Sequence, residues 1–238
     1  MLGCHRFTTL VIAPAAMANA MASAQESSSI TSYPDGRPAA KYRLDATDAG
    51  RVFKHGSGPN NCDALGAREA SVVLHDGTYH LFYDGAEPGV GWLACLATST
   101  DLENWQRHGP VFSYGEPGTL DSHTATSPWF IRHGGLWHSY YVGCQKTTPP
   151  PNCIPHMPYY TLKAEAKDLK GSWRKRYDVT VVTTELDTYR SDTASPGYLF
   201  WHEGKLRKFF SCAQDVTNAN GTVVHLRSLG MAHAPHPD

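Results

Sequence analysis

The chain has 238 residues, of which 41% are hydrophobic and 18% charged, with a net charge of −1 at pH 7. Its 21 Gly and 16 Pro are typical of a globular protein that is rich in turns. Because the Lys and Arg residues are scattered and balanced by acids, the composition excludes an extended basic surface, and no nucleic-acid partner is expected.

The N-terminal residues predict export. Residues 1–24 are typical of a secretory signal peptide, since Arg6 precedes a short apolar run that ends in small residues. Residues 25–41 are rich in Ser, Pro, Gly and Ala and are interpreted as a flexible linker. No stretch approaches the roughly 20 apolar residues of a membrane span, so no membrane partner is expected. The sequence thus predicts a secreted or periplasmic protein.

Five cysteines follow the predicted signal peptide. Cys144 and Cys153 flank a Pro-rich loop, and in an exported protein this spacing predicts a disulfide that staples the loop. The odd count leaves at least one thiol over. Because the chain has no CxxC pair and its 13 His are dispersed, no metal site is expected.

Residues 68–112 predict four short strands in succession. The hairpin signal His75-Asp76-Gly77 separates the first two strands, and turns rich in Gly, Pro or Asp separate the others. The predicted strands are 71–74, 78–83, 92–98 and 105–112. Four antiparallel strands of this size are typical of one blade of a β-propeller.

The same pattern returns twice along the chain. A His-x-Gly turn recurs at 133–135 and 202–204, and Trp173 repeats the place of Trp105 before a fourth strand. The predicted blades are 63–115, 121–184 and 190–238, the last one incomplete. We therefore predict an all-β fold, with a propeller domain of the five-bladed type over 42–238 that contains about three four-stranded blades. A complete open sheet domain is the alternative, although it would leave exposed edges.

Charged side chains come near the start of each predicted first strand, which faces the central funnel of a propeller. An alignment of the repeats on Ser71, Ser127 and Ser195 places six of them near the mouth of the funnel: Asp63, Arg68, Glu69, Asp121, His123 and Asp192. Glycoside cleavage needs two carboxyl groups, one to protonate the leaving oxygen and one to activate water or attack the sugar. The pattern therefore predicts a glycosidase site, although each acid taken alone is also explained as a turn or cap residue.

Four motifs resemble the five-bladed propeller glycoside hydrolases, a broad group that includes families 43, 32, 62, 117 and 130. The motifs are Glu69-Ala-Ser-Val-Val, Tyr79-His-Leu-Phe-Tyr-Asp84-Gly, Ala97-Thr-Ser-Thr-Asp-Leu-Glu-Asn-Trp105 and Thr193-Ala-Ser-Pro196. The resemblance covers residues 63–238. It implies a hydrolase of oligo- or polysaccharides whose partner is its carbohydrate substrate. It implies no cofactor, apart from a structural Ca²⁺ that the funnel of a full-length protein could hold.

The resemblance also implies catalytic roles. In the family 43 pattern the first three blades supply a general base, a carboxyl group that modulates pKa and a general acid, and by position these roles fall to Glu69, Asp121 and Asp192. Two motifs depart from the family: Glu69-Ala70 stands in place of Asp-Pro, and Ala194-Ser195-Pro196 stands in place of Glu-Gly-Pro.

Four further residues are interpreted as substrate contacts: Asp63, Arg68, Asp84 and His123. Asp63 also competes with Glu69 as the base. Two other functions stay open. A phosphorylase of the same fold needs a basic phosphate pocket, for which Arg68 and His123 are available. A carbohydrate-binding propeller without catalysis is the other, because a fold does not imply a function.

Overall fold

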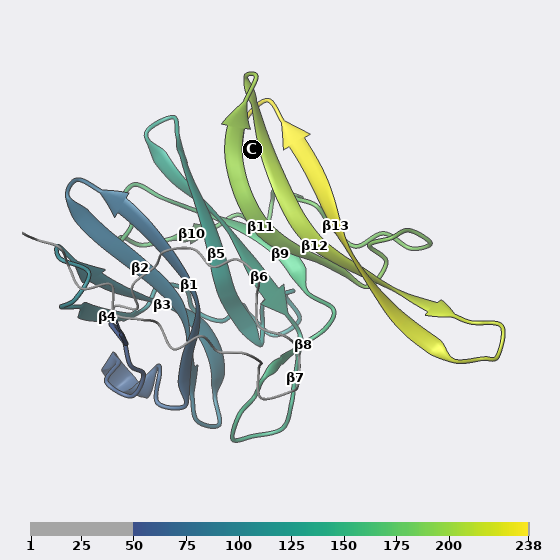
Figure 1. The fold of residues 1–238 in the computed structure, drawn as a ribbon, viewed down its shortest axis with the longest axis horizontal. Helices are drawn as coiled ribbons and strands as arrows, with labels where there is room; N and C mark the ends of the chain where they lie inside the picture. Colours follow the sequence, from purple (N-terminus) through teal and green to yellow (C-terminus); the bar gives the residue numbers. More distant parts are fainter. Residues whose placement is uncertain (1–49, 238) are drawn as a thin grey trace, which may run out of the picture. The chain divides into compact units, whose positions relative to one another are not determined.

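The computed structural model describes residues 50–237 (Figure 1). The predicted signal peptide and linker lie outside the described residues. The described part contains thirteen strands and one short 3₁₀ turn, η1 (Pro59–Asn61). No helix within it is long and apolar enough to span a membrane. The prediction of an all-β fold is confirmed.

The first blade consists of four antiparallel strands. They are β1 (Gly66–His75), β2 (Thr78–Glu87), β3 (Gly91–Ser99) and β4 (Gln106–Pro110). The hairpin predicted between β1 and β2 is confirmed. Asp76 and Gly77 at its tip have φ of +47° and +70°, the left-handed backbone that a type I′ turn requires at both central positions.

The second blade repeats this order. Its four strands are β5 (Thr124–His133), β6 (Leu136–Cys144), β9 (Tyr160–Ala166) and β10 (Arg174–Lys175). Its predicted hairpin is confirmed, with Gly134 and Gly135 at positive φ between β5 and β6. A short hairpin of β7 (Lys146–Thr147) and β8 (Pro155–His156) interrupts the loop between β6 and β9.

The third blade has three antiparallel strands in the described residues. They are β11 (Thr193–His202), β12 (Lys205–Thr217) and β13 (Val223–Ala234). Glu203 and Gly204 form the predicted turn between β11 and β12, again at positive φ. The β12–β13 pairing continues out to Thr217 and Val223, so the two strands extend as a long ribbon (Figure 1).

Neighbouring blades meet through the third strand of one and the first strand of the next. β3 and β5 run parallel and pair at Trp92–Thr124, so the first two blades share one sheet of eight strands. Between the second and third blades, Ala194 N donates to Tyr159 O at 3.1 Å and Thr161 Oγ1 donates to Ala194 O at 2.8 Å. No sheet closes into a ring within residues 50–237, and the five-blade count stays a prediction.

Aromatic side chains fill the space between strands. Phe82, Leu96 and Trp137 form one buried cluster, against which Trp173 packs. Trp105, at the equivalent place of the first blade, packs against another cluster. The two Trp residues at the starts of the predicted fourth strands therefore serve blade packing, as the repeat predicts.

A buried aspartate, Asp63, holds strands of the first blade together, and we call its contacts with Tyr83 and Arg107 the brace of this blade. Asp63 is fully buried, and its Oδ2 accepts hydrogen bonds from Tyr83 Oη at 3.2 Å and from Arg107 Nη1 at 2.6 Å. Gly58 N donates to Asp63 Oδ1 at 2.7 Å. These contacts join the segment before β1 to β2 and β4.

The second blade repeats this brace. Asp121 is also fully buried, and its Oδ2 accepts hydrogen bonds from Tyr141 Oη at 2.8 Å and from Lys175 Nζ at 2.5 Å. In both blades the tyrosine lies in the second strand, 20 residues after the aspartate, and the cation lies in the fourth strand. The acids that precede the first strands of these two blades are therefore structural ion pairs.

Lys175→Met tests this brace. The substitution leaves the buried Asp121 carboxylate without its cation, so we expect the free energy of unfolding to fall by about 3–5 kcal/mol in urea titrations. Arg174→Met is the matched control, because the Arg174 side chain is 68% exposed and its ion pair with Glu165 should contribute no more than about 1 kcal/mol. Equal losses in the two variants would contradict the assignment.

Candidate functional site

The first strand of every blade carries a β-bulge, at the same distance from the hairpin turn in the first two blades and one residue nearer to the turn in the third. The register with the second strand shifts between Arg68 and Ser71 in β1, between Thr126 and Trp129 in β5, and between Pro196 and Leu199 in β11. The first bulged residues are Glu69, Ser127 and Gly197, and the first two are equivalent, because each lies six residues before the His of its hairpin turn. Glu69 and Ser127 have φ of +54° and +48°. Such strain in residues other than glycine is concentrated at functional sites.

This register corrects the alignment of the repeats. Ser127 is equivalent to Glu69, so its alignment with Ser71 is wrong by two residues. Counting back from the hairpin turns gives the same result, because Glu69 and Ser127 each lie six residues before the His of the turn, His75 and His133. Asp121 and Asp192 precede their strands and do not occupy the place of Glu69.

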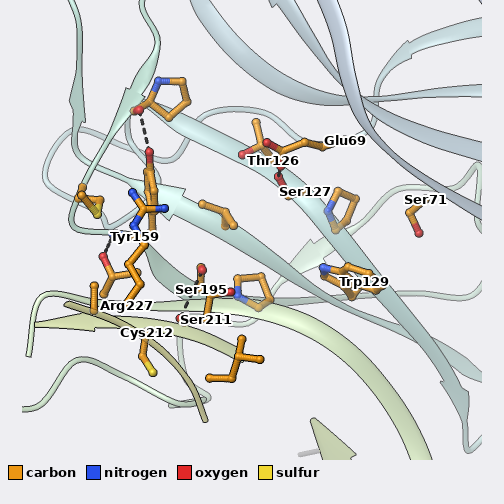
Figure 2. A pocket seen from close by; sticks show the side chains of 18 of the residues that line it. Glu69, Ser71, Thr126, Ser127, Trp129, Tyr159, Ser195, Ser211, Cys212 and Arg227 are labelled. Atoms are coloured by element: carbon orange, nitrogen blue, oxygen red, sulfur yellow. Dashed lines mark hydrogen bonds between the residues drawn. The ribbon is translucent and has the colours of Figure 1, made fainter. Parts of the chain in front are cut away.

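A pocket of about 600 Å³ opens beside the three bulges (Figure 2). Side chains from all three blades line it. Its polar and aromatic groups include Arg68, Glu69, Ser127, Trp129, Tyr159, Thr193, Ser195 and Arg227. Glu69 is the one carboxyl group that lines the pocket among residues 50–237. Hydroxyl, guanidinium and aromatic groups together suit a ligand that carries many hydroxyl groups.

Ser127 joins Glu69 to a second carboxyl group, that of Asp84. Ser127 N donates to Asp84 Oδ1 at 2.6 Å, and Ser127 Oγ lies 2.7 Å from Asp84 Oδ2 and 2.6 Å from Glu69 Oε2. A hydroxyl group has one hydrogen and cannot donate to both carboxyl groups. One of the two must therefore hold a proton and donate it to Ser127 Oγ.

Burial identifies Asp84 as the protonated group. Asp84 is 1% exposed, whereas the Glu69 side chain is 54% exposed. Removal from water raises the pKa of Asp84 to about 7, although its hydrogen bonds with Ser127 act in the opposite direction. A chain of hydrogen bonds then runs from Asp84 through Ser127 to Glu69. It leaves Glu69 as a proton acceptor that faces the pocket.

The structure places two of the predicted substrate contacts at this site. Arg68 lines the pocket, with its guanidinium carbon 4.1 Å from the centre of the Trp92 ring and its Nε 3.8 Å from Glu69 Oε1. Asp84 does not line the pocket and reaches it through Ser127. Contact between Asp84 and a substrate would need the buried carboxyl group to be uncovered.

The three predicted catalytic carboxyl groups do not meet in the pocket. Glu69 lines it, whereas Asp121 is held in the brace of the second blade. Asp192 directly precedes the pocket-lining Thr193, and its Oδ2 lies 3.8 Å from His225 Nδ1. The catalytic roles inferred for these residues stay predictions.

Two other predicted contacts also lie away from the pocket lining. Asp63 belongs to the brace of the first blade. His123 is exposed, with its Nδ1 3.1 Å from Ser122 Oγ. The basic pair that a phosphate pocket would use, Arg68 and His123, is therefore not assembled in this pocket.

The structure does not form the disulfide predicted between Cys144 and Cys153. Both residues are buried thiols. Cys144 Sγ donates a hydrogen bond to Lys146 O at 3.1 Å, so the Cys144 thiol contacts the backbone of the loop that follows it. Within residues 50–237, no group of three or more His, Cys, Asp or Glu side chains is arranged to hold a metal ion.

Sequence reasoning missed three pocket residues: Ser127 as a bridge, Tyr159 and Arg227. The available signal was the pair Ser-Pro, which recurs at 127–128 and 195–196 in two first strands. Tyr159 and Arg227 have no local motif. They reach the pocket because β9 packs beside β11 and β13 pairs with β12.

Asp84→Asn tests the position of the proton. The folded chain keeps the Asp84 proton up to about pH 7, whereas the unfolded chain releases it near 3.8. The free energy of unfolding should therefore fall as pH rises between these values, by up to about 1.4 kcal/mol per pH unit. Asparagine does not titrate, so urea titrations of Asp84→Asn should lose this part of the slope. The exposed turn variant Asp76→Asn should keep it, and an unchanged slope in Asp84→Asn would contradict the assignment.

Comparison with known proteins supports the fold. No family model and no curated protein matches the chain. A family 117 glycoside hydrolase of the marine bacterium Zobellia galactanivorans is similar with a TM-score of 0.59 and 18% identity, over 79% of this chain and 57% of that one. A thermostable family-43 glycoside hydrolase is similar with a TM-score of 0.52 and 18% identity, over 76% and 56%. The chain spans little more than half the length of these structures, and it has the fold of the propeller glycoside hydrolases.

Proposed function

We propose that the protein is a secreted glycoside hydrolase that binds oligo- or polysaccharides in the pocket containing Glu69. The observation that carries this proposal is the chain from Asp84 through Ser127 to Glu69. Because Asp84 holds the proton, Ser127 donates to Oε2 of Glu69, and the half-exposed Glu69 carboxylate can take a proton from water in the pocket. Activation of water by a carboxylate is one half of inverting glycoside hydrolysis.

The other half is protonation of the leaving oxygen, for which Asp192 is our candidate. Its side chain is 30% exposed, and it directly precedes Thr193 in the pocket wall. Separation of the acid and base carboxyl groups by about 6.5–9.5 Å in a substrate complex would support inversion, and about 5–5.5 Å would support retention.

A second candidate function is carbohydrate binding without turnover. It is favoured by the single carboxyl group in the described pocket lining, since the place equivalent to Glu69 in the second blade holds Ser127 and the bulge of the third blade begins at Gly197. Trp129 and Tyr159 could still contact the apolar faces of a sugar, and the hydroxyl groups of the pocket could bind its oxygens.

Glu69→Gln separates these functions. We expect release of reducing sugar from a panel of plant and algal oligosaccharides to fall by about 10²–10⁴-fold, because glutamine cannot accept the proton from water. Oligosaccharide binding measured by calorimetry should change much less, because the pocket keeps its shape. Asp76→Asn, in an exposed turn, is the control for both measurements.

Three outcomes would change the assignment. Full turnover by Glu69→Gln would show that Glu69 takes no part in the reaction. Binding of glycans without turnover of any substrate by the unaltered chain would establish the second candidate. Turnover that requires inorganic phosphate would identify a phosphorylase.

A further inference from the structure

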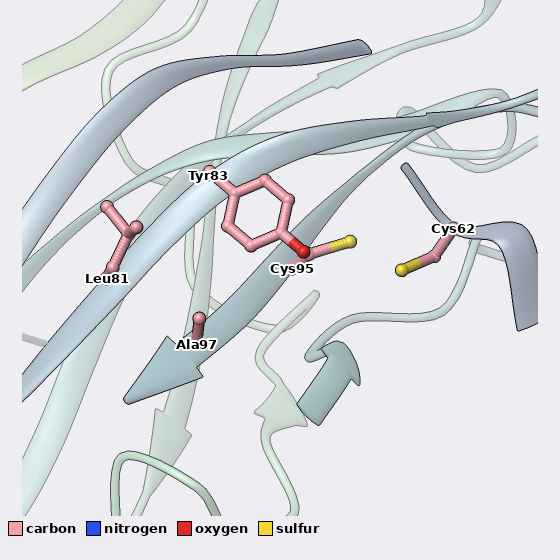
Figure 3. Close-up of a cluster of buried hydrophobic side chains, with 5 residues drawn as sticks. All are labelled: Cys62, Leu81, Tyr83, Cys95 and Ala97. Carbon is pink, nitrogen blue, oxygen red and sulfur yellow. The ribbon is translucent and has the colours of Figure 1, made fainter. Parts of the chain in front are cut away.

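Two buried cysteines face each other in the first blade and play no part in the pocket. Cys62 follows η1 and is 4% exposed, and Cys95 lies in β3 and is 0% exposed. Both belong to one buried cluster with Leu81, Tyr83 and Ala97. Figure 3 shows the two sulfur atoms turned toward each other beside the ring of Tyr83. The pair therefore occupies the same packed cluster.

The backbone around this pair is close-packed. A Cβ at Gly85 would lie 2.7 Å from Cys95 Sγ and 2.5 Å from the carbonyl oxygen of Cys62. A Cβ at Gly58 would lie 2.6 Å from Cys62 Sγ. Glycine at both positions lets the segment before β1 approach the sheet closely enough to bring its sulfur to that of Cys95.

Other described cysteines have different partners. Cys144 Sγ donates to Lys146 O, and Cys212 Sγ donates to Ser228 O at 3.2 Å. Each of these thiols is satisfied by a backbone carbonyl group. Cys95 Sγ also donates to a backbone carbonyl, Leu93 O, at 3.6 Å. What sets Cys95 apart is the second sulfur that faces it, that of Cys62 (Figure 3).

We propose that Cys62 and Cys95 form a disulfide bond when the protein meets a low-molecular-weight or protein disulfide as oxidant. A Cys62 thiolate attacks the external disulfide, forms a mixed disulfide and expels one external thiolate. Cys95, after losing its proton, attacks Cys62 Sγ and expels the second external thiolate. The two protons lost by the cysteines are taken up by the released thiolates, so one disulfide is reduced as the other forms.

Cys62 is the better first nucleophile. The neighbouring Cys95 thiol lowers the pKa of Cys62, whereas the same contact and burial raise the pKa of Cys95. Arg107 also lowers the pKa of Cys62. The finished bond would close residues 62–95 into a loop that contains β1 and β2, and therefore both Glu69 and Asp84.

Peptide mapping of the full chain tests the proposal. The protein is incubated with oxidised glutathione, its free thiols are alkylated in denaturant, and it is digested with trypsin without reduction. Every cysteine after the predicted signal peptide falls on a different tryptic peptide: 55–68, 69–107, 133–146, 147–163 and 209–227. We expect 55–68 and 69–107 to be recovered joined and to separate on reduction. Recovery of both with alkylated cysteines, or joined to other peptides, would overturn the proposal.

Thermal unfolding gives a second measurement. The oxidised chain should lose about 5 °C or more in Tm when dithiothreitol is added, because the bond restrains the unfolded chain. Cys62→Ser should lose this response, and Cys212→Ser, which removes another buried thiol, should keep it. Absence of the response in the oxidised chain, or its loss in Cys212→Ser, would overturn the proposal. The peptide map needs no variant and decides the question even if Cys62→Ser does not fold.

Discussion

The contact between Asp84 and Ser127 connects the fold to the pocket. Asp84 projects from β2 of the first blade, and both hydrogen bonds that Ser127 makes with it come from β5 of the second blade. One buried side chain therefore fixes the position of one bulge relative to the other. The hydrogen bonds between Asp84 and Ser127 involve no cation, so burial favours the neutral form of the Asp84 carboxyl group. The neutral carboxyl group sets the direction of the hydrogen bond that reaches Glu69.

The buried carboxyl groups of the two braces are stabilised by ion pairs instead. Asp63 and Asp121 are fully buried, as Asp84 nearly is, but Arg107 and Lys175 lie within hydrogen-bond distance of them. Their charges are compensated, so they hold strands together and are unavailable to a ligand. Asp84 thus differs in role from Asp63 and Asp121 because of the partner that the fold supplies to each.

The strands and turns could be predicted from local sequence, and the pocket could not. Asp76-Gly77 and the corresponding pairs of the other blades supply the positive φ that a two-residue hairpin needs, so these turns are visible in the sequence. The fold that the motif resemblance implies is supported by the similarity to two solved glycoside hydrolases. Counted from the His-x-Gly turns, Glu69 and Ser127 both lie six residues before the His, so an alignment on the turns matches them, and an alignment on Ser71 and Ser127 does not. Arg227 reaches the pocket only through strand pairing that no local pattern encodes.

The most direct test of this account is the titration of the Asp84 carboxyl group itself. Carbon-detected NMR of the folded chain, with the Asp84 signal assigned from its absence in Asp84→Asn, gives the midpoint of its protonation. We expect a midpoint near pH 7, with Asp84 largely protonated at pH 6. A midpoint near the ordinary value of 3.8 would mean that Asp84 is ionised beside Ser127, and it would contradict the proton chain to Glu69.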